Sequence, residues 1–224
     1  MDNPTGFAVA IDGPVGVGKS TAAQQLAYDM GMTYIDTGAM YRAVALFNMR
    51  AGHDVNDESA IISSLEKICI NLTPTGSVIL NGEDVSSEIR NQALAEYTSA
   101  IAAYPAVRAK LTRQQKLLAE NGEVVMDGRD IGSQVLPWAQ VKIYLDAHVN
   151  IRAKRRQREL KAKGQPADFA QILEETKIRD ERDKNRKTAP LIRTEDAVYI
   201  DASYMSPKEL LCKITRLVQE RKGN

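Results

Sequence analysis

A glycine-rich stretch near the N-terminus has the residue types and spacing of a phosphate-binding loop. Gly13-Pro14-Val15-Gly16-Val17-Gly18-Lys19-Ser20 matches the P-loop pattern G-x-x-x-x-G-K-[ST] at every required position. Glycines let the backbone curl so that successive N–H groups point into one concavity, and a helix that begins at Lys19 adds its own unpaired N–H groups. The pattern predicts that residues 13–21, Thr21 included, bind a nucleoside triphosphate, with Lys19 at the β- and γ-phosphates and Ser20 on Mg²⁺.

A second candidate for the metal site is the acid that ends the apolar run Glu123-Val124-Val125-Met126-Asp127. An acid at the end of a buried strand is typical of a Walker B motif, whose carboxylate holds Mg²⁺ directly or through water. The alternative is a strand-end acid that contacts only solvent. We expect Ser20 and Asp127 to form the metal site, with Mg²⁺ as the cofactor.

Arginines recur at places where an anion could bind them. Arg42 and Arg129 follow the second and third expected strands, at the edge where open α/β sheets bind ligands. Two further groups lie at helical spacing: Arg152, Arg155 and Arg156, and then Arg179, Arg182 and Arg186. A solvated pair of charged helices is the alternative, but Glu159 is the only acid between Arg152 and Lys163. A polyphosphate would relieve that repulsion, and the planar guanidinium group suits it.

No histidine or cysteine is placed to act as a base or nucleophile, since His53 lies in a turn and His148 beyond a strand end. A hydroxyl acceptor must lose a proton when it attacks, so it needs a base or a positioning group. A phosphate monoester is already anionic, because its second pKa is near ~6, and its obstacle is charge repulsion. Arginines, a lysine and Mg²⁺ solve that problem by neutralisation and alignment. The sequence therefore favours a nucleoside monophosphate as acceptor.

Three alternatives stay open at this point. One is a kinase for another nucleoside monophosphate, UMP first, and another is a metabolite kinase that phosphorylates a hydroxyl with Asp36 or Asp130 as the base. A P-loop switch or regulatory binding module is a different class of protein. A GTPase would need an Asn-Lys-x-Asp motif, and the sequence contains none.

The elements that must position these residues alternate between strands and helices. Apolar runs predict five strands, at residues 7–11, 32–36, 123–127, 141–146 and 198–201. Helices are expected after the P-loop, from Thr37 to about Arg50, over 56–67, 92–103, 105–121, 150–163 and 168–184, and from Pro207 to about 221. Strand–helix–strand units at this spacing predict a parallel sheet with helices on both faces, an α/β three-layer P-loop NTPase fold.

The stretch between the second and third of these strands has a different pattern of residues, one typical of short antiparallel strands. Residues 68–72 and 77–80 read as strands around the turn Thr73-Pro74-Thr75-Gly76, and Asn81-Gly82 is a hairpin signal. We expect a small antiparallel insertion at about 64–103 and an arginine-rich helical lid at about 150–184. The core would then comprise residues 1–63, 104–149 and 185–224.

Composition bounds the remaining properties. The 224 residues carry 30 basic and 29 acidic side chains, a net charge of +1, which argues against nucleic acid or a membrane surface as partner. Cys69 and Cys212 lack a pairing pattern, no secretion signal precedes the first strand, and no apolar run reaches membrane-span length. We expect a cytoplasmic protein, and a monomer because no exposed apolar helix stripe stands out.

Four motifs together resemble bacterial cytidylate kinases. They are Gly13–Ser20, Asp36-Thr37-Gly38-Ala39-Met40-Tyr41-Arg42, Asp127-Gly128-Arg129-Asp130-Ile131-Gly132 and Arg179-Asp180-Glu181-Arg182-Asp183-Lys184-Asn185-Arg186. The match runs in order from about Phe7 to the last helix. The β-containing insertion resembles the enlarged monophosphate-binding domain of this family.

The resemblance implies ATP and CMP or dCMP as substrates and assigns a role to each candidate residue. Thr37, Arg42 and Arg129 would bind the acceptor phosphate. Ser99, Arg108 and Asp130 would recognise cytosine, because its N4 amino group can donate a hydrogen bond to a carboxylate. Arg179 and Asp183 would contact the ribose or hold the phosphate arginines. The implied CMP-binding residues are Thr37, Tyr41, Arg42, Ser99, Arg108, Arg129, Asp130, Arg179 and Asp183. The implied catalytic residues are Lys19, Arg129, Arg155, Arg156 and Arg186, with Arg155 also on ATP.

Overall fold

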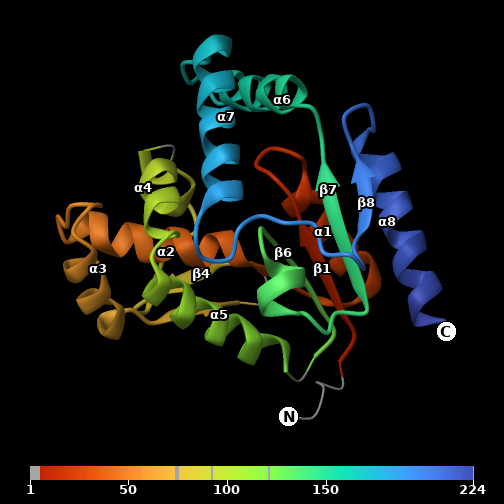
Figure 1. Ribbon diagram of the computed structural model, residues 1–224, viewed down its shortest axis with the longest axis horizontal. Helices are drawn as coiled ribbons and strands as arrows, with labels where there is room; N and C mark the ends of the chain where they lie inside the picture. Colours follow the sequence, from red (N-terminus) through yellow and green to blue (C-terminus); the bar gives the residue numbers. More distant parts are fainter. Residues whose placement is uncertain (1–5, 74–75, 92, 121, 224) are drawn as a thin grey trace.

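The computed structural model describes residues 6–73, 76–91, 93–120 and 122–223. At its centre lies a sheet of five strands in the order β2-β6-β1-β7-β8 (Figure 1). In chain order these strands are β1 (Ala8–Asp12), β2 (Thr33–Asp36), β6 (Val124–Gly128), β7 (Val141–Asp146) and β8 (Val198–Asp201). Every pairing is parallel, which confirms the expected five-stranded parallel sheet.

Helices account for most of the remaining chain. They are α1 (Lys19–Met30), α2 (Thr37–Arg50), α3 (Glu58–Ser64), α4 (Ala93–Ile101), α5 (Pro105–Ala119), α6 (Val149–Ala162), α7 (Phe169–Asn185) and α8 (Pro207–Lys222). Shorter turns are the 3₁₀ helices η1 (Leu65–Lys67) and η2 (Glu88–Arg90) and the π-helical η3 (Ile131–Val135). The expected helix bounds agree to within a few residues, although the helix expected to reach Lys67 becomes 3₁₀ after Ser64. Gln92, Asn121, Pro74 and Thr75, which limit other expected elements, lie outside the described residues.

Helices cover both faces of the sheet because its central strand is apolar on both. All five residues of β1 are buried. Val9 and Ile11 pack in one cluster with apolar residues of α1 and α8. Ala8 and Ala10 pack in another with residues of β6 and η3, as the alternation of strand side chains requires. The three layers expected from the sequence are therefore present.

The antiparallel insertion lies between β2 and β6 in the chain. Its strands are β3 (Ile70–Leu72), β4 (Val78–Leu80) and β5 (Glu83–Asp84). Asn81 and Gly82 both have positive φ, 50° and 90°, as a tight hairpin turn of this kind requires. Apolar residues of this sheet pack with α2, α3, α4 and α5 in a cluster separate from those of the large sheet. The expected small antiparallel sheet is confirmed.

The helices α6 and α7 form a pair that stands apart from the sheet, at the top of Figure 1. Ala153, Leu160 and Ile172 make a small buried cluster between them. Arg152 of α6 and Asp180 of α7 add an ion pair, with side chains only 5% and 9% exposed. This pair is the arginine-rich helical element expected from the sequence.

The strand register brings acids to one edge of the sheet. Asp36 of β2 lies opposite Asp127 of β6, and Asp12 of β1 lies opposite Gly128. The P-loop, α2 and the segment after β6 all begin at this carboxyl edge, where parallel sheets bind ligands. Across the described ranges, no helix is long and apolar enough to cross a membrane.

Candidate active site

The P-loop begins after β1 with Gly13, and the neighbouring strand leaves no room for a larger residue at this position. Gly13 has φ 149°, and a Cβ there would lie 1.9 Å from the carbonyl oxygen of Leu145 on β7. At the other end of the loop, Gly18 has φ 100° and precedes the first residue of α1. A left-handed conformation of this kind favours glycine. The glycines of the motif therefore fix where the loop starts and where the helix begins.

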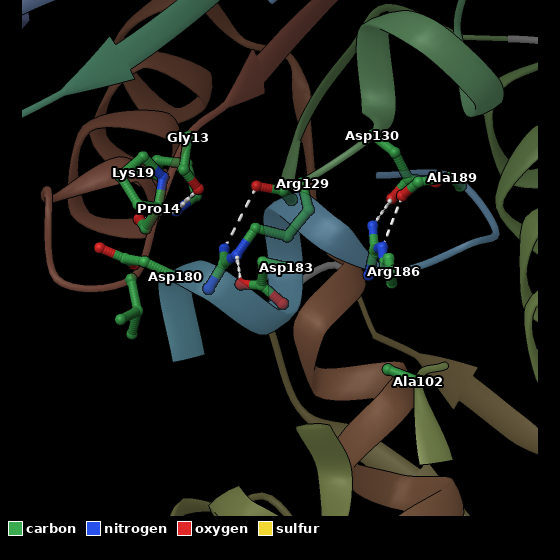
Figure 2. A network of polar contacts seen from close by, with 12 residues as sticks. Gly13, Pro14, Lys19, Ala102, Arg129, Asp130, Asp180, Asp183, Arg186 and Ala189 are labelled. Carbon is green, nitrogen blue, oxygen red and sulfur yellow. Dashed lines mark hydrogen bonds and ion pairs between the residues drawn. The ribbon is translucent and has the colours of Figure 1, made fainter. Parts of the chain in front are cut away.

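Lys19 is buried beneath this loop. Its Nζ donates to the carbonyl oxygens of Gly13 and Pro14, each at 2.8 Å (Figure 2). Burial, and then the nearby charge of Arg129, lower the pKa of Lys19 to about 7. The ammonium group thus lacks a counter-ion strong enough to offset its burial, and a phosphate in the loop would supply one.

A hydroxyl–carboxylate pair lies next to the loop. Ser20 Oγ donates to Asp127 Oδ2 at 2.9 Å, and Tyr34 donates its hydroxyl to Oδ1 at 2.7 Å. Thr37 Oγ1 donates to the carbonyl oxygen of Asp127 at 2.6 Å. Burial, and then the charge of Asp36, raise the pKa of Asp127. A cation beside this carboxylate would stabilise its ionised form.

Four arginines from different elements lie close enough for their charges to interact, and we call them the arginine cluster: Arg42 of α2, Arg129 after β6, Arg156 of α6 and Arg179 of α7. The charge of Arg129 also acts on Lys19. Burial, and then the charge of Arg129, lower the pKa of Arg179 to about 10, and Arg42 and Arg156 add to this repulsion. Nε of Arg42 and Nε of Arg179 are buried without a hydrogen-bond partner. Because buried donors are normally paired, these two groups are suited to bind an anion.

Two acids hold parts of this cluster in place. Asp36 accepts the backbone N–H of Ala39 at the start of α2 and a guanidinium N–H of Arg42 at 2.9 Å. Asp183 accepts from Arg129 Nε at 2.7 Å (Figure 2). Burial works against the ionised form of Asp183, but Arg129 lowers its pKa overall. Each acid orients one arginine while leaving the cluster positive.

A second polar group lies around Asp130, apart from Lys19 and Arg129 in Figure 2. Its carboxylate forms ion pairs with Arg108 of α5 and, at 3.4 Å, with Arg186. The Arg108 guanidinium also lies 5.6 Å from the ring centroid of Tyr41 and donates to the carbonyl oxygen of Ala102 at 3.2 Å. A cavity of about 530 Å³ opens beside Arg108 and Asp130. Ser99 lies half-buried in α4.

The structure therefore brings the predicted residues into two groups. The first group lies around the P-loop and the arginine cluster, and it comprises Lys19, Ser20, Thr37, Arg42, Asp127, Arg129, Arg156, Arg179 and Asp183. The second group lies beside the cavity, and it comprises Tyr41, Arg108, Asp130 and Arg186. Arg155 lies on the P-loop from the side of β8, donating to the carbonyl oxygens of Val17 at 3.3 Å and Ala202 at 2.7 Å.

Arg152 differs from the sequence-based expectation that it faces an anion beside Arg155 and Arg156. It is buried, and its guanidinium donates to both carboxylate oxygens of Asp180, at 3.1 and 2.5 Å. Further donations reach the carbonyl oxygens of Ala147 and Val15. Its donors are thus used to join α6, α7 and the P-loop. The sequence places three arginines at helical spacing but does not show that one of them turns inward.

The structure adds residues that the sequence reasoning missed. Tyr34, on Asp127, shares a face of β2 with Asp36 because strand side chains alternate. Asp180 follows the buried residues Ile172 and Thr176 at steps of four, so this spacing signals the inner face of α7. Asp12, at the end of β1, gave no local signal beyond its position before the P-loop.

Phosphate chemistry accounts for the loop, the buried lysine and the arginine cluster together, and with the parallel sheet they define a P-loop kinase. A family model described as cytidylate kinase matches residues 9–220. The chain therefore belongs to the cytidylate kinase family.

Individual relatives agree with this assignment. The chain is 46% identical over 220 residues to a cytidylate kinase of Geobacillus kaustophilus, covering 97% of this chain and 98% of the relative. A cytidylate kinase of Mycobacterium leprae is 44% identical over 220 residues, covering 98% of both chains. A solved structure of an uncharacterized protein from Eubacterium ventriosum aligns with a TM-score of 0.51 at 12% identity, covering 96% of this chain and 98% of that one, which shows similarity of fold alone.

Proposed function

We propose that this protein transfers the γ-phosphoryl group of ATP to CMP and dCMP, with Mg²⁺, and so supplies CDP and dCDP to pyrimidine nucleotide metabolism. The observation that carries the proposal is the arginine cluster, in which two guanidinium Nε atoms are buried without a hydrogen-bond partner and Arg129 lies near Lys19. Family membership supports the choice of CMP as acceptor. We expect the enzyme to act as a cytoplasmic monomer.

The donor half of the site is the P-loop. Residues 13–21 would bind the ATP phosphates through backbone N–H groups and the N-terminus of α1. Lys19 would release its two carbonyl acceptors and contact the β- and γ-phosphates. Arg155, already on the loop at Val17, would neutralise the donor from the opposite side. Arg156 would approach the transferred group from the arginine cluster.

The residues present fit a magnesium ion. Ser20 and Asp127 offer a hydroxyl and a carboxylate oxygen 2.9 Å apart, and Mg²⁺ prefers hard oxygen donors. No group of three or more His, Cys, Asp or Glu side chains able to hold a metal occurs in the part of the chain that the structure describes. Few protein ligands are expected here, because phosphate oxygens and water complete the magnesium shell of such kinases. When bound, the ion neutralises charge on the β- and γ-phosphates.

The acceptor phosphate would lie in the arginine cluster. Arg42, Arg129 and Arg179 can contact it together, with Thr37 at the start of α2, and the free Nε atoms of Arg42 and Arg179 are donors without a partner. Asp183 would keep Arg129 aimed at this phosphate. Charge neutralisation is the main task, since a phosphate monoester enters as an anion and needs no base.

Cytosine would lie beside Asp130. Its N4 amino group can donate to the Asp130 carboxylate, whereas uracil would place an acceptor oxygen there and leave two acceptors facing each other. Ser99 of α4 and Arg108 of α5 would donate hydrogen bonds to N3 and O2 of the base. Tyr41 would pack against the base. Arg186, paired with Asp130, would neutralise charge from this side.

Closure of the antiparallel insertion and of the helical lid over the substrates would complete the site. We propose that residues 64–103 move with the monophosphate and that the lid at 150–184 moves with ATP. The remaining residues, 1–63, 104–149 and 185–224, would be the fixed core. Closure over both substrates would exclude water, which otherwise competes as acceptor.

An acceptor panel tests the proposed function. Purified protein receives ATP and Mg²⁺ with CMP, dCMP, UMP, AMP, GMP or shikimate, and ADP release is measured for each. We expect the highest kcat/KM with CMP or dCMP. A higher value for AMP or shikimate would show that the assigned acceptor is wrong, and ADP release that is independent of any acceptor would favour a nucleotide switch.

A further inference from the structure

Asp12 is a buried acid that the reaction itself does not use. It ends β1 directly before the P-loop and is 6% exposed. Its two carboxylate oxygens accept the backbone N–H groups of Ile131 and Gly132, at 2.8 and 2.7 Å. Burial raises the pKa of Asp12 to about 6, and these two hydrogen bonds oppose the rise. The N–H groups of Ile131 and Gly132 thus stabilise the ionised carboxylate of Asp12 in the interior.

The segment held by Asp12 begins immediately after Asp130. Ile131 starts the π-helical turn η3, and the carbonyl oxygen of Asp130 accepts the N–H of Gln134 at 2.8 Å. The carboxyl side of the Asp130 backbone is therefore tied to η3. A shift of Ile131 would carry the Asp130 carboxylate with it, away from Arg108 and Arg186.

Gly132 shows how closely the chain passes Asp12. A Cβ at Gly132 would lie 3.3 Å from Asp12 Oδ2 and 3.3 Å from Cδ of Lys142. Lys142 is itself anchored on the carbonyl oxygen of Pro137 at 2.7 Å. The backbone of Gly132 thus lies between two anchored side chains, and a methyl group there would crowd both of them.

We propose that Asp12 is a positioning residue for acceptor selectivity: by holding Ile131 and Gly132 it fixes the carboxylate of Asp130 where it discriminates cytosine from uracil. The inference rests on the proposed function. It connects the strand that carries the phosphate loop to the side chain that reads the acceptor base.

The first test is Asp12→Asn, measured at pH 7.5 with CMP and UMP as acceptors. An asparagine amide group would face one backbone N–H with another donor, so one of the two hydrogen bonds is lost. We expect the CMP-to-UMP ratio of kcat/KM to fall about tenfold, from the loss of a hydrogen bond to a charged group. The fall should come mainly from a higher KM for CMP, with the KM for ATP changed less than about twofold because the P-loop glycines remain.

A second variant, Gly132→Ala, crowds the contact between the same segment and Asp12 without removing a charge near Lys19. Asp57→Asn is the matched control, because Asp57 also accepts a backbone N–H, that of Ala60 at 2.9 Å, but does so at the start of α3. We expect Gly132→Ala to lower the selectivity in the same direction and Asp57→Asn to leave it unchanged.

The outcomes are distinct. Unchanged selectivity in either folded variant at position 12 or 132 would overturn the positioning role. An equal fall of kcat with CMP and UMP would also overturn it, since Asp12 would then act through Lys19. A wild-type enzyme that fails to phosphorylate CMP would instead refute the proposed function, and the wild-type measurement is made first.

Discussion

At the scale of single residues, Lys19 shows how the site is prepared for an anion. Its ammonium group is buried against two carbonyl oxygens, and its pKa of about 7 lies well below the ordinary value. Without substrate, the folded protein therefore binds a proton at Lys19 more weakly than the unfolded chain does between pH 7 and 10.5. A bound phosphate would reverse this effect, because an opposite charge stabilises the ammonium form.

This reversal predicts a proton uptake on nucleotide binding. Because the lowered pKa favours the neutral form of Lys19 in the free enzyme at pH 8, ATP binding at that pH should take up protons. Below about pH 6 this uptake should vanish, since Lys19 is then already protonated. Calorimetric titrations in two buffers of different ionisation enthalpy measure the uptake. Lys19→Met is the control and should bind ATP without it; an equal uptake by that variant would place the titrating group elsewhere.

At the scale of secondary structure, the pair Arg152–Asp180 joins α6 to α7 and to the P-loop. Arg152→Leu should leave Asp180 buried without a partner and lower the free energy of unfolding by about 3–5 kcal/mol. Urea denaturation measures this change. The double variant Arg152→Leu, Asp180→Leu should recover much of the loss, because it buries no unpaired charge. Equal losses in the single and the double variant would show that packing, and not charge, dominates here.

The segment after α7 stores backbone strain beside Arg186. Ala189 has φ 49°, unusual for a residue other than glycine, and its carbonyl oxygen accepts from Arg186 Nε at 2.5 Å. A β-branched residue tolerates this conformation poorly, so Ala189→Val should destabilise the protein by about 1–3 kcal/mol and raise the KM for CMP.

Ala189→Gly is the matched control for this prediction, because glycine adopts positive φ without steric cost. It should keep the KM for CMP close to that of the wild type. Thermal unfolding and steady-state kinetics of the two variants give the answer. A valine variant with an unchanged KM would mean that the Ala189 carbonyl does not position Arg186 for the acceptor.

Local patterns account for most elements that could be predicted from the sequence. Each central strand is an apolar run, and acids at the starts of α3 and α7, Asp57 and Asp168, accept N–H groups of the first turn as expected of N-caps. The strand order and the π-helical turn at Ile131–Val135 depend on packing between distant segments, so no local pattern signals them.

The candidate site likewise contains residues that local patterns predict and residues whose positions depend on distant segments. The P-loop and Asp127 follow from motif and spacing, because a phosphate loop requires those residue types in that order. The inward turn of Arg152 and the bond from Tyr34 to Asp127 depend on partners far away in the sequence. The roles of Ser99 and Arg108 came from family resemblance, since a half-buried serine on a helix carries no chemical signal of its own.

At the scale of the whole molecule, two neighbouring clusters of charge would face different parts of the proposed substrates. Lys19 and the arginine cluster would hold phosphates, and Asp130 with Arg108 would hold the base. These groups lie on the helices α1, α2 and α5, on the segment after β6 and on the helix pair α6–α7 (Figure 1). An acceptor that carries both a phosphate and a cytosine would connect them.

The most direct measurement follows the γ-phosphoryl group itself. ATP labelled on its γ-phosphate is mixed with enzyme, Mg²⁺ and equal concentrations of CMP and UMP, and the labelled products are separated. We expect the label in CDP, in amounts equal to the ADP formed, with little in UDP or inorganic phosphate. Label that accumulates in UDP or in inorganic phosphate while CDP stays unlabelled would contradict it.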